Sequence, residues 1–290
     1  MGWIITYLPP PFGYTFSMKN IYITDLDHTF LRNDLSVSEY TKSIWNAKQK
    51  TALMGVATAR TFRKTMQFLG GVELSLPLIL LDGALVATRE RKIIDAKFID
   101  QESADLIIAE GAKFGVFPFV LALEDANLNE AFLHSETLNS YQAEIITRYI
   151  KEDNLQPQKN LRAPKDNFKI VYMGDKEVLE ALYKHVHAIF GERFKYIFAP
   201  EAYLDCYFFT VLHKDADKAH GIRTVQEFGD FSYDRLTVFG DNLNDLGMFE
   251  LSRTAVAVAN AQKELKEKAT IVLPHTNDED AVARYLEALV

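Results

Sequence analysis

The chain has 290 residues and a mass of 33.0 kDa, a length that corresponds to about two ordinary domains. Hydrophobic residues make up 48% and charged residues 25%, which is typical of a folded globular protein and excludes a disordered or fibrous chain. The 32 basic and 40 acidic side chains give a formal net charge of -8, so no overall field attracts nucleic acid or an anionic membrane. We therefore expect no nucleic-acid partner and no membrane association.

A single cysteine, Cys206, excludes an intrachain disulfide and every CxxC motif, which favours a cytoplasmic location. Its apolar surroundings in the sequence predict an inert thiol in a buried strand. Residues 1–17 lack the basic start of a secretion signal and contain three consecutive prolines. We expect this segment to be a disordered leader and the folded chain to begin at Met18.

Apolar runs alternate with amphipathic windows over residues 18–85, a pattern typical of βαβ units with a parallel sheet. Ser36 and Glu39 have the spacing of a capping box at the start of a helix, and Asp82-Gly83 ends the last strand of this part. The expected elements are strands over 21–24, 52–57 and 78–81 and helices over 36–49 and 61–69.

Residues 86–213 have a different character, with longer aromatic strands that mix apolar and polar side chains. This mixture predicts an α+β insertion built on an antiparallel sheet with one solvated face. Its most distinct elements are strands over 116–123 and 168–172 and helices over 102–114, 136–151 and 175–190.

Residues 214–290 return to the alternating pattern of the first part. We therefore predict an α/β core made of residues 18–85 and 214–290, interrupted by the insertion. The expected elements of the last part are helices over 218–228, 243–250, 262–268 and 279–288 and strands over 236–239, 255–258 and 270–273.

Acidic side chains follow two strands of this predicted sheet. Asp25 and Asp27 come at the end of the first strand, and Asp241 and Asp245 follow the strand over 236–239. Ligands of open α/β sheets bind at the carboxyl ends of the strands, and carboxylates are the ligands that Mg²⁺ prefers. Each cluster alone is also compatible with turn capping and solvated acids, but two such clusters at one sheet edge indicate a metal site.

Two further segments carry polar groups to the same edge. Thr58 and Arg60 follow the strand over 52–57, so that the hydroxyl could donate to a phosphate oxygen or simply cap the next helix. Lys218 lies at the start of a helix, where the dipole disfavours a cation unless an anion lies opposite.

These four segments, in this order, resemble the four motifs of the haloacid dehalogenase (HAD) superfamily over nearly all of residues 18–290. The superfamily has a Rossmann-like core with a parallel sheet flanked by helices, and the insertion resembles the C2-type cap of its Cof-like phosphatases. Asp82-Gly83-Ala84 stands where that group usually has Asn-Gly-Ala, and Ala259-Asn260-Ala261 resembles its C-terminal signature.

The resemblance implies a role for each matching residue. Asp25 would be the nucleophile and Asp27 the general acid/base, and Asp25, Asp27, Asp241 and Asp245 would make up the Mg²⁺ site. The phosphate-binding residues would be Thr58, Lys218 and Asn244. The chain departs from the motifs at His28, where a small or aromatic residue is usual, at Ala59, where glycine is usual, and at Asp82.

The resemblance implies a Mg²⁺-dependent hydrolase of small phosphorylated metabolites, sugar phosphates above all, that works through an aspartyl-phosphate. A phosphotransferase or mutase on the same fold is the first alternative, and a nonenzymatic sensor of a phosphorylated ligand is the second. The sequence opposes the sensor because Asp25 and Asp27 are both present. It leaves the oligomeric state and the natural substrate open.

Overall fold

The computed structural model describes residues 19–149, 154–201 and 204–289, and the predicted leader lies outside this part of the chain. The chain divides into two compact units, one built from the residues up to Ala96 and from Asp217 onward, the other from Lys97–Ala216. We predicted the boundaries after residues 85 and 213. Both boundaries lie further along the chain, the first because the strands over 85–87 and 93–96 belong to a sheet of the first unit.

The first unit contains a parallel five-stranded sheet in the order β14-β13-β12-β1-β2. This order confirms the predicted α/β class with a parallel sheet. Every residue of β1 is buried, as expected for a central strand covered on both faces. The strands are β1 (Ile21–Thr24), β2 (Leu53–Val56), β12 (Leu236–Gly240), β13 (Thr254–Ala257) and β14 (Ile271–Val272).

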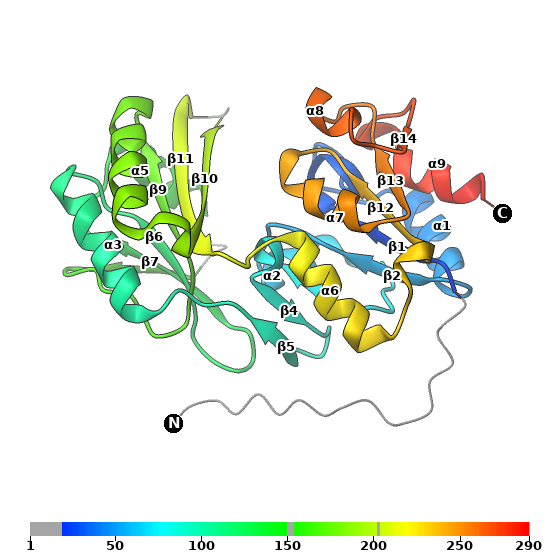
Figure 1. Ribbon diagram of the computed structural model, residues 1–290, viewed down its shortest axis with the longest axis horizontal. Coiled ribbons are helices and arrows are strands. Elements are labelled where there is room, and N and C mark those ends of the chain that lie inside the picture. Colours follow the sequence, from blue (N-terminus) through cyan, green and yellow to red (C-terminus); the bar gives the residue numbers. More distant parts are fainter. Residues whose placement is uncertain (1–18, 150–153, 202–203, 290) are drawn as a thin grey trace. The chain divides into compact units, whose positions relative to one another are not determined.

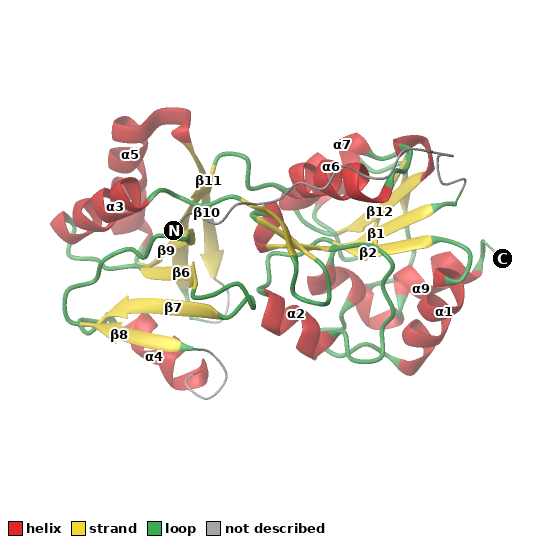
Figure 2. Ribbon diagram, turned by 90° about the horizontal axis from the view of Figure 1, so that it is seen from below, coloured by secondary structure: helices red, strands yellow, loops and turns green. Residues whose placement is uncertain are grey.

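Helices cover both faces of this sheet. Figure 2 shows α1 and α9 on one face and α6 and α7 on the other. Leucine, isoleucine, valine and phenylalanine side chains of β1, β12 and β13 are fully buried beneath them. The helices are α1 (Glu39–Gln49), α2 (Phe62–Phe68), α6 (Lys218–Gly229), α7 (Leu246–Leu251), α8 (Lys263–Lys266) and α9 (Ala281–Glu287).

A small antiparallel sheet, β3 (Leu78–Leu80), β4 (Leu85–Ala87) and β5 (Ile93–Ala96), belongs to the same unit. It joins the parallel sheet through a bridge between Ala57 and Ile79. Because β4 pairs with β3 and β5 pairs with β4, both strands are part of the first unit and not of the insertion.

The predicted capping box at Ser36 and Glu39 is wrong. Helix α1 begins at Glu39, and the hydroxyl of Ser38 accepts a hydrogen bond from the Thr41 amide at 2.9 Å. Ser36 lies in the preceding turn, where its own amide donates to Asp34. The spacing rule was satisfied by chance, because Glu39 is the first helical residue instead of the third.

The second unit is an α+β domain with a six-stranded sheet in the order β10-β11-β9-β6-β7-β8. All neighbouring strands are antiparallel except β7 and β8, which are parallel. The strands are β6 (Phe119–Leu123), β7 (Glu130–Ser135), β8 (Leu155–Gln158), β9 (Asn167–Gly174), β10 (Phe194–Glu201) and β11 (Cys206–His213).

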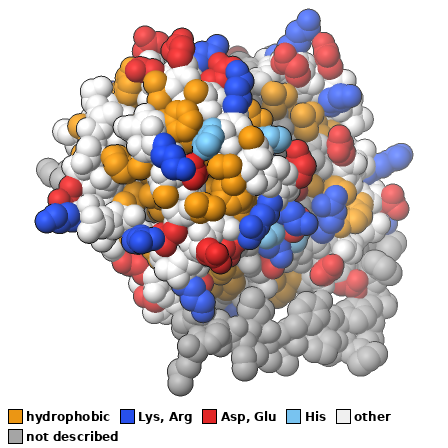
Figure 3. All heavy atoms as spheres, turned by 60° about the vertical axis from the view of Figure 1, so that its left-hand side comes forward, with side chains coloured by type: hydrophobic (Ala, Val, Ile, Leu, Met, Phe, Trp, Pro, Cys, Tyr) orange, Lys and Arg blue, Asp and Glu red, His pale blue; other side chains and the backbone are white. Residues whose placement is uncertain are grey.

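Both faces of this sheet carry helices, whereas we predicted one solvated face. Helices α3 (Gln101–Lys113) and α5 (Lys176–Phe190) pack on the larger apolar cluster. Helix α4 (Ser140–Tyr149) packs on a smaller cluster around Phe119, which includes Cys206. Cys206 is free and buried in β11, as predicted. The surface seen in Figure 3 mixes apolar, basic and acidic side chains.

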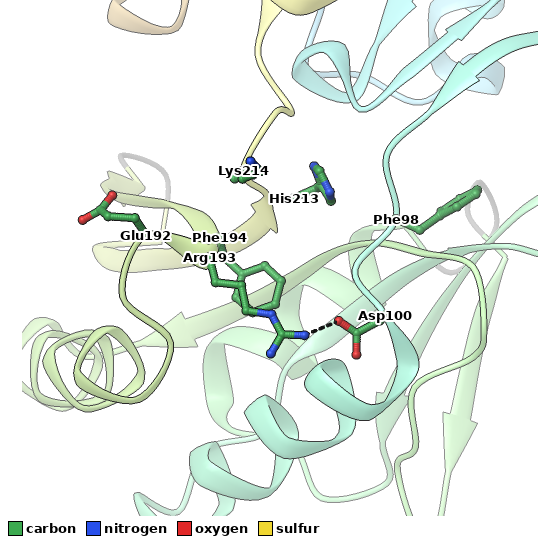
Figure 4. A pocket seen from close by; sticks show the side chains of 7 residues that line it. All are labelled: Phe98, Asp100, Glu192, Arg193, Phe194, His213 and Lys214. Carbon is green, nitrogen blue, oxygen red and sulfur yellow. Dashed lines mark hydrogen bonds and ion pairs between the residues drawn. The ribbon is translucent and has the colours of Figure 1, made fainter.

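The second unit also contains a pocket of about 520 Å³ (Figure 4). Two of its charged side chains, Asp100 and Arg193, form an ion pair at 3.0 Å. None of the side chains that line it is among the predicted site residues, so the pocket gives no support for placing the chemistry in this unit. The lining residues are Phe98, Asp100, Glu192, Arg193, Phe194, His213 and Lys214.

Among the residues that the structure describes, no helix combines the length and the apolar character needed to cross a bilayer.

Candidate active site

Three loops of the first unit leave neighbouring parallel strands at the same edge of the sheet. In the register of the sheet, Thr24 of β1 pairs with Val56 of β2 and with Phe239 of β12. The residues that follow these three therefore emerge side by side. They begin the segments that contain Asp25, Thr58 and Asp241.

Lys218, the first residue of α6, brings two of these segments together. Its Nζ atom lies 2.5 Å from Oδ1 of Asp25 and 2.6 Å from Oδ1 of Asp245. The lysine side chain is completely buried, and those of its two partners are nearly so. A buried ammonium requires such partners, since an unpaired charge in the interior is strongly unfavourable. The two carboxylates thus explain why a lysine can be the first residue of α6, where the helix dipole alone disfavours a cation.

Asp245 uses both of its carboxylate oxygens within the protein. Oδ1 accepts from Lys218, and Oδ2 accepts from the backbone amides of Asp241 and Asn242 at 2.9 and 3.1 Å. Gly240 makes this possible, because a Cβ at that position would lie 2.5 Å from Oδ2 of Asp245. Asp245 thus fixes the loop that holds Asp241, and it has no oxygen without a hydrogen bond.

Asp241 completes a cluster of three carboxylates. One oxygen each of Asp25, Asp241 and Asp245 can be chosen so that all three lie within 4.8 Å of one another. The Thr29 hydroxyl donates to Oδ1 of Asp241 at 3.1 Å and so orients it. The predicted acidic groups after β1 and β12 therefore meet at one point, as the sheet topology requires.

Burial and mutual repulsion shift the pKa values of this cluster. Burial raises the pKa of Asp25 well above its usual value, although Lys218 opposes the shift. Burial, with the charge of Asp245, raises the pKa of Asp241 to about 6. For Lys218 burial alone would lower the pKa, but the neighbouring carboxylates raise it above its ordinary value. The lysine is therefore cationic at neutral pH.

The donor set suits a small divalent cation. Asp25 and Asp241 each have one carboxylate oxygen for which the structure shows no hydrogen bond, and both are hard ligands of the kind that Mg²⁺ prefers. The excess of negative charge around a single lysine also favours a cation, and it is one cause of the raised pKa of Asp241.

Asp27 points to a different partner. Nε of Arg60 lies 3.0 and 2.7 Å from its two carboxylate oxygens, and Nη2 lies 2.5 Å from Oδ1. The Arg60 guanidinium is itself held over the Phe68 ring, 4.5 Å from the ring centre. Sequence reasoning noted Arg60 only as a cation at this edge. The available signal was its position in the loop after β2, because β2 is the strand beside the one that Asp27 follows.

Thr58 is fully buried, and its hydroxyl oxygen accepts from the Arg60 amide at 3.2 Å. The hydroxyl proton is still available for another acceptor, because this bond uses only a lone pair. Asn244 donates from Nδ2 to Oδ1 of Asp82 at 2.9 Å. Asp82 is a site neighbour that we had treated only as a departure from a motif.

The family model for haloacid dehalogenase-like hydrolases matches residues 22–286. The chain belongs to this family. The match spans both halves of the first unit and the whole of the inserted unit, which agrees with the resemblance drawn from the four motifs.

Similar proteins with curated names include 5-amino-6-(5-phospho-D-ribitylamino)uracil phosphatase YwtE of Bacillus subtilis. It is 25% identical over 299 residues, covering 94% of this chain and 98% of that protein. A second B. subtilis protein of the same activity name, YitU, is 23% identical over 91% of this chain and 94% of its own length.

Solved structures show the same fold. TM0651 of Thermotoga maritima aligns with a TM-score of 0.79 at 24% identity, covering 94% of this chain and 98% of that one. The HAD subclass IIB sugar phosphatase BT4131 aligns with a TM-score of 0.71 at 18% identity, covering 93% and 99%. At these identities the likeness concerns the core with its inserted domain, and it supports the predicted architecture.

Proposed function

We propose that this haloacid dehalogenase-like phosphatase hydrolyses small phosphorylated metabolites, sugar phosphates among them, through an aspartyl-phosphate. The observation that carries the proposal is the Nζ atom of Lys218 held between Asp25 and Asp245, beside the carboxylate of Asp241. Such a site combines a carboxylate nucleophile with the positive charge that an incoming phosphate dianion requires.

In the first step Oδ of Asp25 attacks phosphorus in line with the leaving oxygen. The P–O bond to the alcohol breaks, and Asp27 gives that oxygen its proton. In the second step Asp27 takes a proton from water, the water oxygen attacks phosphorus, and the bond to Asp25 breaks. Thr58 and Lys218 bind the phosphoryl oxygens throughout, and Asn244 orients the site.

We propose that Mg²⁺ is held by Asp25, Asp241 and the backbone carbonyl of Asp27. Bound there, the ion supplies positive charge that offsets repulsion between the carboxylates and the phosphate. Asp245 contributes indirectly, since both of its oxygens already accept hydrogen bonds from the protein.

We further propose that the inserted unit acts as a C2-type cap and sets substrate selectivity, because every residue with a proposed chemical role lies outside it. The free, buried thiol of Cys206 supports a cytoplasmic location, where thiols stay reduced.

The proposed function is tested by phosphate release from a panel of single esters with Mg²⁺ present. The panel contains sugar, polyol and nucleotide monophosphates and also 5-amino-6-(5-phospho-D-ribitylamino)uracil, since relatives are named for it. We expect inorganic phosphate from at least one ester offered alone. A protein that moves phosphate only when a second sugar is added is a phosphotransferase, and one that binds esters without turnover is a sensor.

The raised pKa values predict a pH-dependent effect of Mg²⁺ on stability. The folded protein holds the protons of Asp25 and Asp241 more tightly than the unfolded chain does, because burial raises the pKa of both carboxyls. The protonated form of Asp241 therefore adds fully to the free energy of unfolding below the ordinary carboxyl pKa of about 4, and this contribution is lost as the pH rises through about 6, the pKa of Asp241 in the folded protein. Mg²⁺ relieves the repulsion only when the carboxylates are ionised. We expect MgCl₂ to raise Tm more at about pH 7.5 than at about pH 5.

Asp241→Asn serves as the comparison in this experiment, because the amide keeps the size of the side chain and removes its charge. We expect the Mg²⁺-induced rise in Tm to be small in this variant at both pH values. Equal rises at the two pH values, or an undiminished rise in Asp241→Asn, would contradict the proposed metal site.

A further inference from the structure

The turn that follows β3 has an unusual backbone. Leu81, Asp82 and Gly83 have φ values of 52°, 57° and 88°, so three consecutive residues are in the left-handed region. This region favours glycine, and a side chain such as that of leucine occupies it at a cost in free energy. Strained residues of this kind persist where the surrounding structure fixes them, and they are concentrated at functional sites.

The backbone of this turn is bonded to the Thr58 segment. The amide of Asp82 donates to the Thr58 carbonyl at 3.0 Å, and the amide of Leu81 donates to the Arg60 carbonyl at 3.1 Å. Two backbone hydrogen bonds thus join this turn to the residues on either side of Ala59 in the loop after β2.

The next residue fixes the turn against the start of α6. A Cβ on residue 83 would lie 1.9 Å from the carbonyl oxygen of Asp217, so only glycine allows this approach. Asp217 caps α6 by accepting from the His220 amide at 2.7 Å, and Lys218 comes directly after it. The turn is thus in contact with the residue that positions Lys218.

The side chain of Asp82 contacts the segment after β12, which contains Asn244. Its Oδ1 atom accepts from Nδ2 of Asn244, and the carboxylate is buried. Its charge is also one of those that raise the pKa of Lys218 against the effect of burial. The same turn therefore contacts the segments that contain Thr58, Lys218 and Asn244.

We propose that Asp82 is a positioning residue of the active site, which fixes Asn244 relative to the Thr58 and Lys218 segments through the left-handed turn. The proposal rests on the proposed function as far as catalysis is concerned. An asparagine at this position, as in the Cof-like signature, keeps an acceptor oxygen and tolerates the left-handed region. The proposed role therefore requires an acceptor oxygen for Asn244 and a residue that adopts the left-handed conformation at position 82.

The experiment compares Asp82→Gly with Asp82→Asn. Glycine adopts φ near 57° without strain and keeps the backbone bonds, so Asp82→Gly is expected to fold with an unchanged or higher Tm. It removes the acceptor of Asn244, and we expect kcat to fall about 10- to 100-fold while KM changes only a few-fold. Asp82→Asn is expected to restore kcat to within about threefold of the natural protein.

Asp230→Gly is the matched control. Asp230 is also left-handed, with φ of 46°, but it lies at the far end of α6 as its C-cap. We expect this variant to keep the kcat of the natural protein. A loss of kcat in Asp230→Gly equal to that in Asp82→Gly would show a general effect of glycine and would overturn the assignment.

A second measurement does not depend on turnover. The side-chain amide of Asn244, identified by its absence from the NMR spectrum of Asn244→Ala, is expected to move upfield in Asp82→Gly because its charged acceptor is gone. An unmoved amide resonance, or an unchanged kcat in a protein that does hydrolyse phosphate esters, overturns the proposal. A natural protein that releases no phosphate refutes the proposed function instead, while the amide resonance still tests whether Asp82 positions Asn244.

Discussion

Asp25→Asn is expected to abolish phosphate release from every ester. The amide cannot attack phosphorus, and the substitution also removes one of the two proposed charged ligands of Mg²⁺. We expect activity below detection and no covalent phosphoprotein by intact-mass measurement after rapid acid quenching. The fold is expected to persist, because Lys218 keeps its contact with Asp245 at 2.6 Å.

Asp278→Asn is a suitable control for this experiment. Asp278 belongs to the same unit, and its carboxylate is exposed and hydrogen-bonded to Asn33, with no hydrogen bond shown to the acidic cluster. The same chemical change there is expected to leave turnover unaltered. Phosphate release by Asp25→Asn at a rate near that of the control would eliminate Asp25 as the nucleophile.

Asp27→Asn is expected to slow the hydrolysis of two kinds of ester to different extents. The substitution keeps the backbone carbonyl for the metal but removes proton transfer, so the penalty depends on how much the leaving group needs a proton. An alkyl phosphate is expected to react about 10²- to 10⁴-fold more slowly, whereas p-nitrophenyl phosphate, whose leaving group departs without a proton, is expected to form the phosphoenzyme with a smaller loss.

For p-nitrophenyl phosphate the slow step then becomes hydrolysis of the aspartyl-phosphate, because the attacking water has lost its base. Rapid-quench kinetics are expected to show a burst of p-nitrophenol of about one equivalent per site. Equal losses for both esters with no burst would refute the acid/base role. Asp27 would then be a structural residue held by its paired contact with Arg60.

The order of segments along the chain was sufficient to determine the fold class and to predict which acidic side chains lie close together. Strands such as 21–24 and 236–239 are short apolar runs, each followed at once by acidic residues, and this pattern is local. In a parallel sheet the carboxyl ends of neighbouring strands meet at one edge. The local pattern therefore predicted that Asp25 and Asp241 would lie close together, and the structure brings their carboxylates together.

Contacts between distant residues were decided only by the tertiary structure. The bond from Lys218 to Asp25 joins residues 193 positions apart, and the one from Asn244 to Asp82 joins residues 162 positions apart. No periodicity or spacing rule predicts such contacts, because they depend on how helices and turns pack onto the sheet. The domain boundary after Ala96 has the same origin, since β4 joins the first unit by pairing with β3, and β5 by pairing with β4.

The pairing of Asp27 with Arg60 shows the physical reason most directly. The sequence placed both side chains at one edge of the sheet, but a carboxylate there can bind a metal, a substrate or a guanidinium. Two oxygens and two nitrogens must lie within hydrogen-bonding distance for a forked ion pair to form. The sequence by itself thus determined which charged groups lie at this edge of the sheet, and the packing of the loops determined which of them bind one another.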